Sequence, residues 1–140
     1  MIKKILKETK TIAVVGISSK DERPGFTVPA YLQSQGYRII PVNPNLDKRL
    51  GEKAYPDLQS ISDAVDLVLL FRRSEAIPPF VEDAIQIGAK AVWMQLGVIH
   101  KSAAKKAQEA GLDVVMDKCI AIEHNRLTNR QAGVFSSSHR

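Results

Sequence analysis

The chain has 140 residues, of which 44% are hydrophobic and 25% charged, as expected for a soluble globular protein with one core. The sequence contains no apolar run long enough to span a membrane and no signal-peptide pattern, and its single cysteine excludes an internal disulfide and favours a reducing cytoplasm. The net charge of +5 suits a small polyanionic ligand or weak contact with nucleic acid, and we expect neither nucleic acid nor membrane as a partner.

The first segments predict a short helix and a buried strand. Apolar residues recur at helical spacing over residues 2–8, which predicts a helix that covers an edge of the domain. Residues 12–15 are all apolar, so we expect a strand that is buried on both faces. Strands of this kind are typical of parallel sheets with helices on both sides.

The loop after this strand is the most informative stretch of the sequence. Gly16 lets the backbone leave the strand freely, and Ser18 and Ser19 offer donors to an anion. Arg23 and Pro24 stand at the start of the next predicted helix, where a diphosphate would lie. The loop therefore predicts a site for the pyrophosphate of an adenine-containing cofactor. Any α/β domain needs a loop here, however, and the full G-x-G-x-x-G fingerprint is absent.

Three units follow in which an apolar-periodic helix ends at a glycine and leads into an apolar strand. The units are residues 26–42, 74–94 and 102–116. We expect Pro29 in the first turn of the first helix, where a missing N–H costs little, and Ser74 and Ser102 as caps of the other two. A further strand is predicted over residues 65–70 after a helical turn at 60–64, and a short edge strand near 53–55.

These elements predict a single α/β domain with a doubly wound parallel sheet in three layers, α/β/α. The strand that begins at Thr11 is expected to be central. The domain is expected to span residues 1–127. Residues 128–140, which end in small polar side chains, are expected to form a disordered tail.

The residues after the second strand help to distinguish between types of cofactor. A domain that binds NAD usually has an acidic residue there, to bind the ribose hydroxyls. This chain has Asn43 and Pro44, and the first carboxylate is Asp47, followed by Lys48 and Arg49. The pattern disfavours NAD and accommodates a phosphorylated ribose, unless Asn-Pro merely forms a turn.

Two other strand ends are followed by side chains that could contact a ligand. Arg72 and Arg73 follow the strand at 65–70, and we expect one to reach a phosphate while the other is solvated or pairs with Glu75. Cys119 follows the last strand and either meets a ligand thiol or is a small core residue.

We find no arrangement of residues typical of catalysis or of metal binding. Glu123 and His124 have the chemistry for acid–base work, but we favour a role in capping or orienting a terminal helix. We therefore assign no catalytic residue and no metal ligand.

Together these residues resemble a known family, the small single-domain CoA-binding proteins of bacteria and archaea (YccU-like). Their fold is similar to the CoA-binding domain of the succinyl-CoA synthetase α subunit. The resemblance covers about residues 5–127. The matching stretches are TIAVVGIS at 11–18, RP at 23–24, GYRIIPVNP at 36–44, VDLVLLFRRSE at 65–75, GAKAVWMQLGV at 88–98 and AGLDVVMDKCIAIEH at 110–124.

The resemblance implies a Rossmann-like domain that binds coenzyme A. The diphosphate would lie over the loop at 16–19, the adenosine against residues 42–44, and the pantetheine arm past residues 71–73 toward 94–96. The implied CoA-binding residues are Gly16, Ile17, Ser18, Ser19, Arg23, Pro24, Val28, Val42, Asn43, Pro44, Phe71, Arg72, Arg73, Met94, Gln95, Leu96 and Cys119.

The function that we expect is CoA binding without chemistry of its own. The alternatives are an NAD(P)-linked oxidoreductase and a non-catalytic partner of an acyl-CoA ligase. The ligase subunit carries a phosphorylated histidine in a second domain, which has no counterpart in this sequence, so ligase activity is not expected. The sequence leaves open a homo-oligomer or an unidentified protein partner. We also expect Cys119 to form a mixed disulfide with bound CoA under oxidation.

Overall fold

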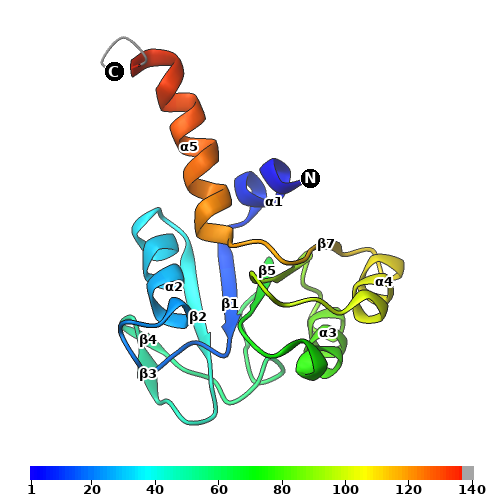
Figure 1. The fold of residues 1–140 in the computed structure, drawn as a ribbon. Helices are drawn as coiled ribbons and strands as arrows, with labels where there is room; N and C mark the ends of the chain where they lie inside the picture. Colours follow the sequence, from blue (N-terminus) through cyan, green and yellow to red (C-terminus); the bar gives the residue numbers. More distant parts are fainter. Residues whose placement is uncertain (137–140) are drawn as a thin grey trace.

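The computed structural model describes the backbone of residues 1–136 and the side chains of residues 1–129. Figure 1 shows how helices and strands alternate along the chain. The strands are β1 (Thr11–Val15), β2 (Arg38–Val42), β3 (Lys48–Arg49), β4 (Glu52–Lys53), β5 (Leu67–Leu70), β6 (Ala91–Met94) and β7 (Asp113–Val115). The helices are α1 (Ile2–Glu8), α2 (Pro24–Ser34), the 3-10 helix η1 (Ser74–Ala76), α3 (Ile77–Gln86), α4 (Lys101–Glu109) and α5 (Ile120–Ser136).

Five strands form the main sheet in the order β2-β1-β5-β6-β7, and every neighbouring pair is parallel. The chain goes from β1 outward to β2 and then returns past β1 to β5, so the direction of winding reverses beside β1. This confirms the predicted doubly wound sheet and places β1 inside it, at the switch point where such folds bind ligands.

Helices cover both faces of the sheet because alternate residues of each strand face opposite layers. Met94 packs in one core with residues of α3 and α4, such as Ile77 and Ala107. The adjacent Trp93 packs in the other core with Ile5 of α1 and Leu32 of α2. These are the three layers that the sequence predicts. No helix within the described residues is long and apolar enough to cross a lipid bilayer.

The two predicted serine caps are wrong. Helix α4 begins at Lys101, and His100 is its cap, because the ring Nδ1 accepts a hydrogen bond from the Ala103 amide at 3.2 Å. Ser74 lies in η1 and its hydroxyl turns away from the helix to accept from the Ile99 amide at 2.9 Å. Ser74 thus holds the loop after β6.

The segment between β2 and β5 matches the prediction only in part, because residues 53–55 do reach the edge of the sheet but residues 60–64 are not helical. Strands β3 and β4 form a separate antiparallel pair, and Tyr55 then makes a parallel bridge to Val42. Residues 60–64 form no helix; a turn closes instead through a hydrogen bond from the Ile61 amide to the Leu58 carbonyl at 3.2 Å.

Helix α5 continues through Ser136, beyond the expected domain end at residue 127, and leaves the body of the domain (Figure 1). Residues 137–140 of the expected tail lie outside the described residues. The domain boundary and the disorder of the tail stay predictions.

Candidate functional site

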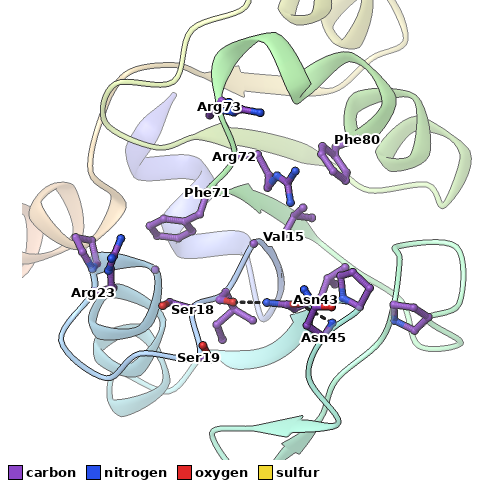
Figure 2. A pocket seen from close by; sticks show the side chains of 17 residues that line it. Val15, Ser18, Ser19, Arg23, Asn43, Asn45, Phe71, Arg72, Arg73 and Phe80 are labelled. Carbon is purple, nitrogen blue, oxygen red and sulfur yellow. Dashed lines mark hydrogen bonds between the residues drawn. The ribbon is translucent and has the colours of Figure 1, made fainter.

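A cavity of about 670 Å³ lies at the carboxyl ends of β1, β2 and β5, at the switch point of the sheet. Its walls are the loop after β1, the start of α2, the loop after β2 and the loop after β5 (Figure 2). Phe80 of α3 closes one side. The volume is within the range of small-molecule and cofactor sites. We call this space the first cavity.

Gly16 fixes the floor of the first cavity. It has a φ of +83°, and a Cβ built on it would lie 2.6 Å from the Phe71 carbonyl oxygen. Its amide donates to the Val42 carbonyl at 3.0 Å. Only glycine fits this position without a shift of the backbone, so the loops after β1 and β5 lie in close contact.

Pro29 has an unexpected part in the loop after β1. It is the sixth residue of α2 rather than a member of its first turn. Because proline has no N–H, the Gly25 carbonyl has no donor from the residue four places on. The Ser18 amide donates to this carbonyl instead, at 3.0 Å. The proline thus frees an acceptor that ties the loop to the helix.

Asn43 braces two loops with one side chain. Its Nδ2 donates to the Ile17 carbonyl at 2.9 Å, the bond dashed in Figure 2, and its Oδ1 accepts from the Asn45 amide at 2.8 Å. The second bond is an Asx turn, so the turn considered as an alternative is present, but the bond to Ile17 shows that Asn43 does more than form a turn. Asn43 lines the cavity, and its amide nitrogen and amide oxygen each make one bond to the backbone of the surrounding loops.

Arg49 clamps the loop after β1 from outside. Its Nε donates to the Ser18 carbonyl at 2.9 Å, a terminal nitrogen pairs with Asp21 at 2.7 Å, and the guanidinium lies 3.8 Å from the centre of the Phe26 ring. The side chain is only 18% exposed. Arg49 is therefore committed to the loop rather than available to a phosphorylated ribose.

The first cavity favours an anion. Three arginines line it and no carboxylate does. Arg23 is exposed at the start of α2 and has no salt bridge among the described side chains. Arg72 lies over Phe80 at 5.7 Å, and Figure 2 shows it nearer to Val15 than Arg73 is. Arg73 pairs with Glu75 at 3.5 Å, one of the two roles expected for this pair.

A second cavity of about 480 Å³ adjoins the first at the ends of β5, β6 and β7. The two share four residues. These are Pro24, Phe71, Arg72 and Arg73. The remaining lining is mostly apolar and comes from Leu96 and Val98 after β6 and from Cys119 and Ile122 near the start of α5.

Hydrogen bonds from side chains to the backbone hold the loops around the second cavity. The Gln95 side chain is 5% exposed, and its Oε1 accepts from the Ile120 amide at 3.0 Å. The Trp93 indole donates to the Lys118 carbonyl at 2.8 Å, and Asp117 accepts from the Gly97 amide at 2.7 Å. The cavity therefore has a fixed backbone with apolar side chains in front of it.

Most predicted binding residues line one of the two cavities. The first contains Gly16, Ile17, Ser18, Ser19, Arg23, Pro24, Val42, Asn43, Pro44, Phe71, Arg72 and Arg73, and the second adds Gln95, Leu96 and Cys119. Val28 and Met94 line neither cavity, and their side chains pack in the cores on the two faces of the sheet. Ile17 borders the first cavity, but the whole residue is buried in the core with α1 and α2, and its carbonyl accepts from Asn43.

The sequence analysis missed several lining residues. They are Val15, Gly25, Asn45 and Pro56 near predicted loops, Phe80 and Ile122 on helices, and Val98. Asn45 belongs to the same Asn-Pro-Asn loop as Asn43 and could have been included. The helical residues carry no signal in the sequence, because only the packing of the layers brings them to the strand ends.

His124 joins two helices rather than facing either cavity. Its Nδ1 lies 2.8 Å from the Tyr31 hydroxyl, and its ring packs edge-on against Tyr31 and Tyr37. Burial lowers the pKa of His124 below its ordinary value, which favours the neutral ring. This is the orienting role that we favoured. The described residues contain no group of three or more metal-ligating side chains.

Comparison with known proteins places this geometry in context. The profile of a family described as "CoA binding domain" matches residues 10–125. The uncharacterized protein YneT of Bacillus subtilis is 42% identical over 123 residues, which are 88% of this chain and 91% of YneT. A hypothetical protein from Pyrococcus horikoshii has a solved structure with a TM-score of 0.87 and 43% identity, covering 91% of this chain and 89% of that one.

A larger enzyme also contains a similar segment. Acetate–CoA ligase (ADP-forming) II of Archaeoglobus fulgidus is 36% identical over 106 residues, which are 74% of this chain but only 15% of the ligase. The chain therefore corresponds to a small part of that enzyme.

Proposed function

The chain belongs to the CoA binding domain family, and on that premise we propose that it binds coenzyme A in the first cavity. The observation that carries the proposal is the charge of this cavity, which three arginines and no carboxylate line at the switch point of the sheet. A diphosphate there meets cations and a helix start, both of which stabilise negative charge.

The diphosphate lies over the loop after β1 in this proposal. Ser18 and Ser19 line the cavity, and α2 begins beside them at Pro24. The first amides of a helix have no partners within the helix. Arg23, exposed at that point, supplies a guanidinium for a phosphate oxygen.

The adenosine and the pantetheine arm leave this loop in opposite directions. The adenosine packs against Val42 and Pro44, where the lining lacks the acidic residue that NAD-binding domains use for the ribose. That absence supports CoA over NAD(P). The arm passes Phe71, which lines both cavities, and enters the second.

We propose no catalytic role for this chain alone. His124, the residue best suited to acid–base chemistry, is bonded to Tyr31 and lines neither cavity. A second candidate function is the CoA-binding part of an assembled ligase, favoured by the identity to the Archaeoglobus enzyme. A pull-down that recovers no partner with an ATP-grasp domain argues against it. The free Cys119 suits a reducing cytoplasm, where we propose the protein works.

Isothermal titration of the wild type and Arg23→Ala with CoA, dephospho-CoA and NAD tests the proposal. We expect the wild type to bind CoA and to bind NAD far more weakly. Loss of one charge-assisted contact in Arg23→Ala raises the Kd for CoA about tenfold to a hundredfold, or roughly 1.5–3 kcal/mol. Bound CoA at a hundredfold excess over its Kd raises the stability of the wild type by about 2.7 kcal/mol.

Lys20→Ala is the matched control, because Lys20 is an exposed cation of the same loop that does not line the cavity. It should leave the Kd within about twofold, and both variants should unfold at the wild-type temperature. Equal binding of NAD and CoA, or unchanged CoA affinity in Arg23→Ala, contradicts the assignment. The comparison of CoA with dephospho-CoA reports whether the arginines read the ribose phosphate.

A further inference from the structure

The second cavity has a composition that CoA itself does not require. Its lining beyond the shared wall consists of Leu96, Val98, Cys119, Ile122 and the bonded Gln95. We propose that this cavity holds the apolar acyl group of an acyl-CoA, so that the protein selects thioesters with aliphatic chains. The inference rests on the proposed function, because the CoA part anchors the ligand in the first cavity.

Exposed apolar side chains are concentrated here. Four large hydrophobic residues of the described chain are exposed, and two of them, Leu96 at 65% and Ile122 at 49%, line this one cavity. They come from different elements, the loop after β6 and the first turns of α5. Large apolar side chains that gather around a hollow leave a surface whose burial by an apolar ligand is favourable.

The position of the cavity fits the end of a CoA ligand. Phe71, Arg72, Arg73 and Pro24 line both cavities, so the two form one continuous trough along the carboxyl edge of the sheet. The thiol is the part of CoA farthest from the adenosine. A ligand with its diphosphate on the loop after β1 therefore extends past Phe71, and a group attached to the thiol comes next to Leu96 and Ile122.

Beyond the wall that the two cavities share, the lining of the second cavity contains no charged side chain. Gln95 accepts from the Ile120 amide, Arg73 pairs with Glu75, and Arg72 lies over Phe80 on the side of the first cavity. A carboxylate at the end of an acyl chain that extends beyond this wall would lose water without gaining a charged donor. The cavity therefore favours an aliphatic acyl group over an acidic one such as succinyl.

Titration calorimetry with CoA, acetyl-CoA, hexanoyl-CoA and succinyl-CoA tests this inference on the full chain. Burial of the extra methylenes should make hexanoyl-CoA bind about tenfold more tightly than acetyl-CoA. Succinyl-CoA should bind no more tightly than acetyl-CoA. The double variant Leu96→Ser/Ile122→Ser should reduce the advantage of hexanoyl-CoA over acetyl-CoA to about twofold or less.

Ile99→Ser is the matched control, since Ile99 is 42% exposed and lines neither cavity. It should keep the full preference for hexanoyl-CoA. If CoA binds but hexanoyl-CoA binds no more tightly than acetyl-CoA, or if the double variant keeps the preference, the inference is wrong and the proposed function stands. If none of the four ligands binds, both are overturned. The replaced side chains are all exposed, so we expect the variants to unfold at the wild-type temperature. That result would show that the variants are folded.

Discussion

The two cavities share a wall but are built differently. The first is shaped by backbone, through Gly16 pressed against the Phe71 carbonyl and Asn43 bonded to the Ile17 carbonyl. Hydrogen bonds also hold the backbone around the second, but apolar side chains, among them the exposed Leu96, form most of its lining. Under the proposed function, the backbone-built site holds the diphosphate, which every CoA ligand shares. A site built from exposed side chains can change with the group to be bound while the fold stays the same.

Two glycines, one near each cavity, show the same contrast. Gly16 and Gly97 have φ values of +83° and +85°, so a side chain strains the backbone equally at both. Only Gly16 is crowded, with the Phe71 carbonyl oxygen 2.6 Å from an added Cβ, whereas nothing lies within 4 Å of one at Gly97. The pair separates conformational strain from steric crowding.

Gly16→Ala should have the largest effect of the changes considered. We expect a loss of about 3 kcal/mol or more in the free energy of unfolding, from left-handed strain plus the contact with Phe71. Gly97→Ala, with the strain alone, should lose about 1–2 kcal/mol. Urea denaturation measures both. Equal losses for the two variants would refute the claim that the first cavity is the more crowded.

Arg49→Ala should have the next largest effect on stability. Its effect on ligand binding should be confined to the first cavity. The clamp on the Ser18 carbonyl is a hydrogen bond from a charged donor, so its loss should cost about 1.5–3 kcal/mol of stability. With a looser loop we expect the Kd for CoA to rise about tenfold while the hexanoyl preference persists. Arg49→Lys, which keeps the charge but not the planar fork, should resemble Arg49→Ala. A loss of stability without a change in Kd would limit Arg49 to a role in folding.

Replacement of Asp66 should have the smallest effect on stability and should not change ligand binding in either cavity. It lies just before β5, at the amino edge of the sheet, and accepts from the Lys10 and Thr11 amides at 2.9 and 3.0 Å. Burial acts to raise the pKa of Asp66, but these hydrogen bonds and the charge of Lys90 hold it below the ordinary value. The ionised form therefore stabilises the fold above the pKa of the unfolded chain, near pH 4, and this is lost as the pH falls through the lower native pKa.

Asp66→Asn should consequently cost about 1 kcal/mol at pH 7 and less at pH 3, as urea denaturation at the two pH values can measure. Its Kd for CoA at pH 7 should equal that of the wild type. It is therefore the control that separates lost stability from a damaged site. A cost that does not shrink in acid would contradict the depressed pKa.

The sequence predicted the fold well because local signals agree with it. The apolar strand at residues 12–15 and the glycines that follow α2, α3 and α4 indicate the parallel units, and the strand-end rule led to most of the first cavity. Capping was predicted less well. Histidine is not among the residues preferred at helix N-caps, which include serine. The cap of α4 is His100, two residues before the predicted Ser102.

Side-chain direction and long-range contacts could not be predicted from the sequence. Met94 ends β6 beside the cavities, but its side chain faces the core with α3 and α4. Arg49 donates a hydrogen bond to the carbonyl of Ser18, which lies 31 residues earlier in the chain. Arg49 lies in the β3–β4 hairpin, whose sequence has no strong strand pattern. Phe80 reaches the first cavity only because α3 packs over the sheet.

Trp93 gives the protein a built-in optical reporter. It is the only tryptophan in the sequence and is fully buried, so its fluorescence emission should be blue-shifted in the native state and move to the red on unfolding. Its indole N–H is bonded to the Lys118 carbonyl, next in sequence to Cys119 of the second cavity. Emission intensity therefore follows the backbone at that cavity without any attached dye, and a thioester that shifts this segment can be titrated by fluorescence alone.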